Sequence, residues 1–142
     1  GDVYKRQDYE LRFEKDEAAE LCTAVPSTGL IDVTNRSKNP MVGKTLPLSH
    51  ELFDFAETIF DVLESRQVTL SKKGEDKGVR LSFEGFPYLI VWSKPEGDFV
   101  AVEPWGGLST CSDEDDVLEH KRGCLVAKPK ETVVRSFTIE IL

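Results

Sequence analysis

The sequence contains few cysteines and histidines, and this scarcity excludes several kinds of site. Among its 142 residues are three cysteines, Cys22, Cys111 and Cys124, and two histidines. No two cysteines have CxxC spacing, so neither a zinc site nor a disulfide framework is indicated. Unpaired thiols are typical of a reducing compartment, which favours a cytoplasmic protein. We expect Cys111, which lies in an acidic stretch, to be the exposed thiol.

Long apolar runs and an excess of basic charge are also missing. No segment offers the roughly 20 consecutive apolar residues that a membrane-spanning helix needs. The 18 basic residues are outnumbered by 26 acidic ones, which leaves a formal net charge of −8. Nucleic acids and anionic membranes bind basic surfaces, so we expect neither of them as a partner.

The motifs that hold common cofactors are absent as well. The glycines form no GxGxxG after a predicted strand, so a nucleotide site is not supported. The acidic run 113–116 lacks the alternate ligands and central glycine of a calcium loop, and we expect it to be a solvated loop. We therefore expect no metal and no cofactor. Arg66, Arg80 and Lys94 would suit a sugar phosphate if the fold brought them together.

Short runs of β-branched and aromatic residues recur along the chain, separated by turn-forming residues. They predict antiparallel strands, whereas a helical turn is expected only at 50–55, after the possible N-cap Ser49. Such a pattern predicts an all-β sandwich. We also expect 58–63 and 67–71 to pair with each other. The expected strands are 8–13, 19–23, 29–34, 58–63, 67–71, 79–83, 85–92, 100–103, 124–127 and 132–141.

The two runs 85–92 and 100–107 are the most informative part of the sequence. Their residues predict two strands joined by a turn at 95–98. Pro104 has no N–H for a ladder, so we expect the second strand to end at Glu103. A carboxylate at a strand end beside the indole of Trp105 could act as a base on a bound ring. It could equally be a surface glutamate in a local ion pair, and Trp105 could be a core residue.

Four segments resemble, in order and spacing, an aldose 1-epimerase (galactose mutarotase) of the bacterial type. They are Leu52-Phe53 leading to 65–70, the strand 86–94, Glu103-Pro104-Trp105, and the turn 118–123. From Tyr9 to Leu142 the chain is similar to the C-terminal half of such a protein. The resemblance implies the C-terminal part of a galactose mutarotase-like β-sandwich, also called a supersandwich.

Members of that family are about twice as long as this chain. We therefore expect residues 8–142 to be the C-terminal portion of one domain whose N-terminal half is missing. Residues 1–7 read like the translation of a sequencing adapter, and we expect them to be a non-native artefact. A piece of a sandwich should expose sheet edges or an apolar face and should tend to associate.

The resemblance also implies a reaction, the interconversion of the α and β anomers of an aldohexose. A base removes the proton of the C1 hydroxyl, an acid protonates the ring oxygen, and the opened ring recloses on the other face. Each positioned group contributes about 10²–10⁴-fold to the rate. By resemblance Glu103 is the base, and the partner is a small sugar with or without a phosphate. Trp105 offers a flat face for the sugar, and Gly106-Gly107, in place of a bulkier residue, should widen the pocket.

The sequence departs from the family pattern at two further points. The family acid is a histidine of the first half, and we expect His50 and His120 to be surface residues, so this chain alone should be inactive. The acidic sugar contact of the family aligns with Ala56, where Glu57 or Asp54 could replace it. These departures keep two alternatives open, a non-catalytic sugar-binding sandwich and a β-domain in which Glu-Pro-Trp is structural.

Overall fold

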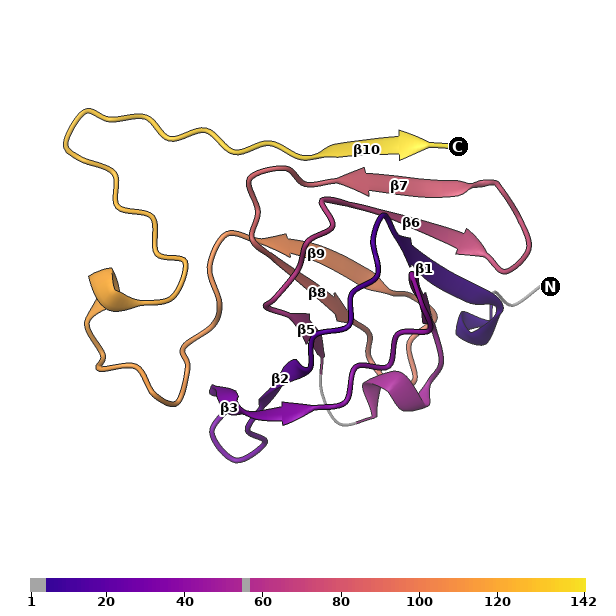
Figure 1. Cartoon of the computed structure of the whole chain (residues 1–142), viewed down its shortest axis with the longest axis horizontal. Helices are drawn as coiled ribbons and strands as arrows, with labels where there is room; N and C mark the ends of the chain where they lie inside the picture. The colour runs from indigo at the N-terminus through magenta and orange to yellow at the C-terminus, as the bar shows by residue number, and fades with distance from the viewer. Residues whose placement is uncertain (1–4, 55–56) are drawn as a thin grey trace.

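The short apolar runs form two antiparallel sheets that pack face to face, as the sequence predicts (Figure 1). The computed structural model describes residues 5–54 and 57–142. In spatial order the first sheet contains β10 (Thr138–Ile141), β7 (Gly78–Ser82), β6 (Gln67–Lys72), β1 (Tyr9–Phe13) and β4 (Thr45–Pro47). The second contains β3 (Ile31–Ser37), β2 (Leu21–Ala24), β5 (Thr58–Phe60), β8 (Tyr88–Trp92) and β9 (Ala101–Trp105).

Helical structure in the described residues is confined to single turns. They are the 3₁₀ turns η1 (Arg6–Asp8), η2 (Glu51–Phe53) and η3 (Leu118–His120). Within this part of the chain, no helix has the length and apolar character needed to cross a membrane. The all-β class predicted from the sequence is therefore confirmed.

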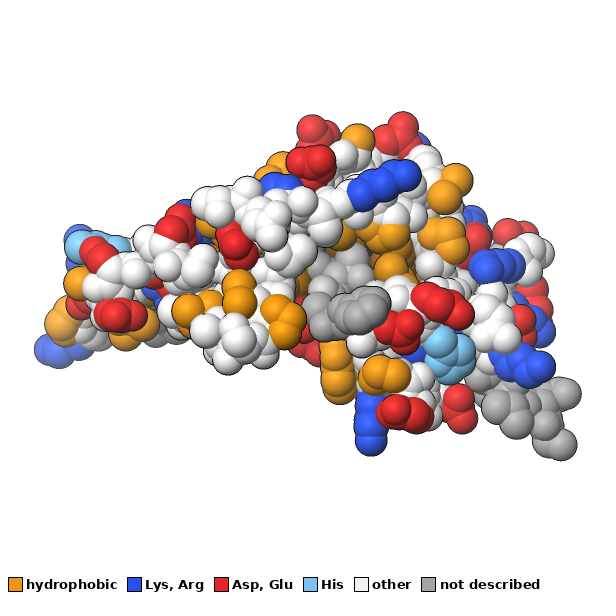
Figure 2. Space-filling model, turned by 90° about the horizontal axis from the view of Figure 1, so that it is seen from below, with side chains coloured by type: hydrophobic (Ala, Val, Ile, Leu, Met, Phe, Trp, Pro, Cys, Tyr) orange, Lys and Arg blue, Asp and Glu red, His pale blue; other side chains and the backbone are white. Residues whose placement is uncertain are grey.

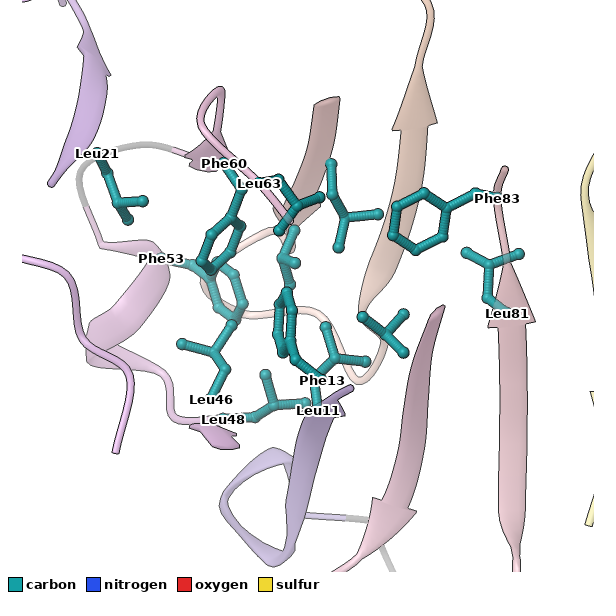
Figure 3. Packing of buried hydrophobic residues seen from close by; sticks show 13 residues of the cluster. Leu11, Phe13, Leu21, Leu46, Leu48, Phe53, Phe60, Leu63, Leu81 and Phe83 are labelled. Atoms are coloured by element: carbon teal, nitrogen blue, oxygen red, sulfur yellow. The ribbon is translucent and has the colours of Figure 1, made fainter. Parts of the chain in front are cut away.

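The main core lies between the two sheets and is built from alternate residues of their strands (Figure 3). Leu11 and Phe13 of β1 are 1% and 3% exposed, and the intervening Arg12 points to solvent. The ring of Phe13 packs against that of Phe60 from β5, with centroids 5.0 Å apart. Burial of each such side chain contributes about 1.5–3 kcal/mol, so this contact is a main link between the sheets.

A second apolar cluster covers the outer face of the second sheet. Three consecutive residues of β8, Leu89, Ile90 and Val91, are at most 1% exposed. Leu89 and Val91 belong to the main core, whereas Ile90 packs with Leu108 and Cys111 in the second cluster. Strands covered on both faces read as continuous apolar runs. This explains why the sequence of β8 does not alternate with polar residues.

The predicted hairpin is present, but its second strand is longer than expected. β8 and β9 pair antiparallel, with Ile90 opposite Glu103 and Leu89 opposite Pro104. The prediction that the strand ends at Glu103 is wrong, since β9 continues to Trp105. β9 is the last strand of its sheet, where a missing N–H leaves no neighbouring strand unsatisfied.

The predicted pairing of 58–63 with 67–71 is also wrong. β5 lies in the second sheet and β6 in the first, so the segment between them crosses the sandwich. The buried carboxylate of Glu17 holds this crossing, because it accepts hydrogen bonds from the backbone N–H groups of Glu64 (3.1 Å) and Ser65 (2.6 Å). Nothing in the local pattern distinguishes this crossing from a hairpin turn.

Residues 5–7, which we expect to be non-native, lie against the rest of the chain. The buried guanidinium of Arg6 donates to the carbonyl oxygens of Lys94 (2.8 Å) and Gly97 and stacks over the Phe53 ring at 5.3 Å. Its Nε and Nη1 atoms have no hydrogen-bond partner. The non-native origin of residues 1–7 remains a prediction.

The cysteines are arranged differently from the expectation. Cys22 and Cys111 are each 2% exposed, and Cys124 is the exposed thiol. The prediction for Cys111 is wrong because an isolated bridge to Ile31 holds its backbone beside β3 and places the side chain in the second cluster. Burial, reinforced by the charge of Asp61, raises the pKa of the Cys22 thiol to about 12.

We expect one thiol to react under native conditions, because Cys124 is exposed, whereas Cys22 and Cys111 are buried and burial raises the pKa of both thiols. Iodoacetamide at pH 8 should modify one cysteine rapidly, as counted by intact mass. Cys124→Ser should remove that fast reaction, and urea should restore reaction at the other two thiols. Fast labelling of Cys124→Ser would contradict the packing described here.

The C-terminal segment exposes more apolar surface than any other part described. Every residue from 123 to 142 is exposed, and only 138–141 form a strand, so the predicted strand at 124–127 is absent and that at 132–141 is shorter. β-Propensity alone did not order these residues where no strand pairs with them. Figure 1 shows this segment looping away from the sandwich before β10 returns to β7.

A groove of about 400 Å³ remains between the sheets at the β7–β10 end. Its lining is apolar and includes Leu81, Val102, Phe137 and Ile139. In Figure 2 hydrophobic side chains are visible in the hollowed centre of one face. The apolar exposure expected from the sequence is therefore present.

We expect the 142-residue chain to associate at micromolar concentration, because exposed apolar patches of this kind are rarely left uncovered. Sedimentation velocity over a concentration series measures this. The double variant Val134→Glu, Ile141→Glu, at residues 81% and 78% exposed, should weaken association. Thr132→Glu, Thr138→Glu adds the same charge without removing apolar side chains and should weaken it less. A monomer at every concentration would refute the expectation.

Candidate functional site

Two carboxylates and two indoles meet on the outer face of the second sheet. They line a hollow of about 200 Å³ whose lining residues are Glu57, Ile90, Trp92, Glu103 and Trp105. Larger hollows include the apolar groove between the sheets and one of about 340 Å³ lined by Asp16, Glu17, Glu20 and Lys38, but neither brings a carboxylate together with an indole. The site is therefore identified by its chemistry, and we call this hollow the carboxylate pocket.

The register of the β8–β9 hairpin brings these side chains together. Alternate residues of a strand share a face, so Glu103 and Trp105 project from the same side of β9. On β8 the residue opposite Glu103 is Ile90, and Trp92 is opposite the small Ala101. Diagonal neighbours in such a pair lie roughly 7–8 Å apart, which places Trp92 and Trp105 on either side of the Glu103 carboxylate.

Glu103 is half-buried and held by its neighbour. Its Oε2 atom accepts a hydrogen bond from Nε1 of Trp105 at 3.0 Å. Among the described residues, no lysine, arginine or histidine forms an ion pair with it. Of the two interpretations left open by the sequence, the surface glutamate in an ion pair is therefore not what the structure shows.

The two tryptophans differ in their surroundings. Trp105 is half-buried and packs against the second apolar cluster, with its indole N–H occupied by Glu103. Trp92 is 39% exposed, and its ring contacts that of Phe99 edge-on at 5.6 Å. Both rings line the carboxylate pocket. Trp105 is therefore partly a core residue and partly accessible to a ligand in the pocket. Trp92, which is exposed, is not a core residue.

Of the two candidates for the acidic sugar contact, the structure brings one to the pocket. Glu57 immediately precedes β5, whose first residue Thr58 pairs with Val91, and its half-buried side chain lines the pocket. Asp54 is exposed at the end of η2 and is not among the lining residues. Ala56, where the family aspartate aligns, lies outside the described residues.

Neither histidine contributes to the pocket. The Nδ1 atom of the exposed His50 lies 2.9 Å from the carbonyl oxygen of Pro95. His120 is exposed as well, and its Nδ1 atom lies 2.7 Å from the Asp115 carboxylate. The carboxylate pocket thus has no histidine among its described lining residues.

The three cations considered for a phosphate do not converge. Arg66 donates to the backbone carbonyl oxygens of Leu63 (2.9 Å) and Ser65 (2.7 Å). Arg80 lies in the first sheet and pairs with Glu140 at 2.7 Å. Within residues 5–54 and 57–142, no group of histidine, cysteine and carboxylate side chains is arranged to hold a metal ion.

The chain that follows β9 folds back and packs against Tyr88, Gly106 and Gly107. Gly123 has φ +70°, and a Cβ there would lie 2.9 Å from the Tyr88 ring and from the Gly106 carbonyl oxygen. The backbone around Gly106 and Gly107 is thus in close contact with the returning chain. The glycine pair allows this packing and is not among the pocket-lining residues, and the expectation that it widens the pocket stays a prediction.

An ion pair that sequence reasoning missed holds the sheet beneath the site. Arg36 of β3 binds the carboxylate of Asp61, just beyond β5, through two hydrogen bonds of 2.6 and 2.8 Å. The Asp61 side chain is only 8% exposed. This bond raises the pKa of Arg36 and ties the edge strand to the strand that carries Glu57. Because Arg36 and Asp61 are 25 residues apart, no local sequence pattern indicates this ion pair.

We expect Asp61→Asn to lower the free energy of unfolding by about 2–3 kcal/mol, because it leaves the partly buried guanidinium of Arg36 without its counter-charge. Urea denaturation followed by circular dichroism measures the change. Glu75→Gln removes a partner of the exposed Lys72–Glu75 pair and should cost at most about 0.5 kcal/mol. Equal effects of the two substitutions would show that the Arg36–Asp61 bond is not structurally important.

Comparison with known proteins finds two relatives that are similar in sequence and two solved structures that are similar in fold. The chain is 38% identical over 139 residues to protein LacX of Lactococcus lactis subsp. lactis, in both its plasmid and its chromosomal form. The match covers 97% of this chain and 46% of LacX. The chain therefore spans about half the length of the curated relatives it matches. No family model matches the sequence.

Two solved structures share the fold. A galactose mutarotase-related enzyme from Lactobacillus acidophilus superposes with a TM-score of 0.82 at 24% identity, over 97% of this chain and 46% of that one. A galactose mutarotase-like protein from Lactobacillus casei gives 0.68 at 25% identity, over 94% and 44% of the two chains. The predicted galactose mutarotase-like sandwich is confirmed.

Proposed function

We propose that this chain, whose fold is that of galactose mutarotase-like proteins, carries the general base of an aldose 1-epimerase, and that Glu103 is that base. The observation that carries the proposal is the half-buried carboxylate of Glu103, held by Trp105 and unpaired with any cation of the described residues. The names of the two structural neighbours support the reaction class.

In the proposed reaction the Glu103 carboxylate takes the proton of the C1 hydroxyl of an aldohexose. As the C1 carbonyl forms, the bond from C1 to the ring oxygen breaks and that oxygen takes up a proton. Rotation about C1–C2 and reclosure in the reverse sense give the other anomer. Every proton removed is returned, so the reaction needs no oxidant, reductant or group carrier.

In this proposal the proton for the ring oxygen comes from a histidine outside the described pocket lining. Neither His50 nor His120 lines the pocket. The chain matches less than half of LacX, and we place the general acid in the remaining part of such a longer protein. By itself the 142-residue chain is expected to bind sugar without accelerating mutarotation.

The other lining residues would position the sugar. The indole faces of Trp105 and Trp92 suit the apolar C–H faces of a pyranose, and the hydrogen bond from Trp105 keeps the base in a single orientation. Glu57 would accept hydrogen bonds from sugar hydroxyls, as the acidic contact of the family does. Asp54 is exposed outside the pocket and has no part in this proposal.

A second candidate function is a sugar-binding sandwich without catalysis. It is favoured by the absence of a histidine from the described pocket lining. The two functions make the same use of Trp92, Trp105 and Glu57, and they differ only in whether Glu103 moves a proton.

We expect Glu103→Gln to lower the rate of mutarotation by about 10²–10⁴-fold in the full-length gene product, since the amide cannot take the C1 proton. Polarimetry on a freshly dissolved pure anomer of galactose or glucose measures this rate. Glu96→Gln is the matched control, because Glu96 is an exposed glutamate in the turn of the same hairpin. It should leave the rate unchanged.

Sugar-dependent quenching of tryptophan fluorescence separates the remaining possibilities. Quenching without any acceleration by the full-length protein would favour the binding sandwich over the enzyme. No response to either hexose would refute both functions and leave Glu-Pro-Trp as a structural feature.

A further inference from the structure

The carboxylate pocket has an unusual balance of charge. Its polar lining consists of two carboxylates, Glu57 and Glu103, and its other described lining residues are Ile90, Trp92 and Trp105. The Trp105 N–H, which could have served as a donor, is bonded to Glu103. The pocket therefore presents hydrogen-bond acceptors and aromatic faces, with no positive group among its described lining residues.

Two arginines on neighbouring elements are neutralised by aspartates, whereas Arg135, whose Nη1 atom would lie 2.5 Å from a Cβ at Gly106, forms no ion pair among the described residues. Arg36, on the edge strand of the same sheet, is bound bidentately by Asp61. In the segment that folds back after β9, Arg122 is bound bidentately by Asp113 at 2.6 and 2.7 Å. Lys94, two residues beyond Trp92, is exposed and does not line the pocket.

Glu57 itself has no compensating partner in the described part of the chain. It takes part in none of the ion pairs there and accepts none of the side-chain hydrogen bonds. Its half-buried carboxylate thus adds a second negative charge to the pocket that holds Glu103. Two carboxylates in one pocket attract cationic ligands and repel anionic ones. Such charges affect which ligand is selected more than how tightly it binds.

We propose that Glu57 makes this pocket selective for the charge of the sugar. Neutral and cationic sugars bind, and phosphorylated or carboxylated sugars are excluded. A protonated amino sugar binds more tightly than the parent hexose, because its ammonium group donates to the carboxylates and lies against the indole faces. This inference rests on the proposed function and narrows its substrate class.

The test compares glucosamine, glucose and glucose 6-phosphate as ligands of the 142-residue chain, by tryptophan fluorescence at pH 6, where the amine carries a proton. Relative to glucose, the ammonium group of glucosamine should raise the affinity about fivefold or more, and the phosphate of glucose 6-phosphate should lower it about fivefold or more. The expected order of affinity is glucosamine, then glucose, then glucose 6-phosphate. Raising the salt concentration should compress the order, since the charges are partly exposed.

Glu57→Gln should bring the three affinities within about threefold of one another while glucose still binds, because the amide keeps the shape and loses the charge. Glu57→Asp keeps the charge and should keep the order; if Glu57→Gln does not fold, Glu57→Ser removes the charge with a smaller polar side chain and should likewise bring the three affinities together. Glu96→Gln, at an exposed residue of the hairpin turn outside the pocket lining, should leave the order unchanged.

The outcomes distinguish this inference from the function on which it rests. If none of the three sugars alters the fluorescence, the proposed function is refuted. If glucose binds and glucose 6-phosphate binds equally well or better, or if Glu57→Gln preserves the order, the charge selection by Glu57 is refuted while sugar binding stands.

Discussion

The pairing of β8 with β9 is the interaction on which the rest of the structure depends. Their register places Ile90 opposite Glu103, so that one face of the hairpin supplies the main core and the other forms the floor of the carboxylate pocket. A slip by one residue would exchange the two faces and bury the glutamate. The fully buried Leu89 and Val91 oppose such a slip, because it would expose both of them.

The same hairpin explains how a carboxylate can lie at a sheet surface without an ion pair. Pro104 is tolerated because β9 is an edge strand, and its ring faces the groove between the sheets. The two residues that flank it, Glu103 and Trp105, then share the opposite face and bond to each other. Glu-Pro-Trp is thus a compact unit in which the proline packs inward and the glutamate is oriented by the indole.

Charge outside the pocket is organised so that the two pocket carboxylates stay unpaired. Arg36 and Arg122, two of the cations on the flanking elements, are each bound by an aspartate in bidentate geometry. These bonds also fix the edge strand and the returning segment that surround the site. The described lining of the pocket holds two carboxylates and no histidine, and the chain covers about half of its LacX relatives.

The sequence by itself determined the all-β class, the β8–β9 hairpin and the identity of Glu103, Trp105 and Glu57 as candidates. Propensity, turn residues and a motif are local properties, and a single chain displays them directly. Tertiary structure alone decided that β5 and β6 lie in different sheets, that Cys111 is buried and that β9 continues past Pro104. Each of these features depends on a contact with a residue that is distant in the sequence. Such long-range contacts produce no local sequence pattern from which they could be predicted.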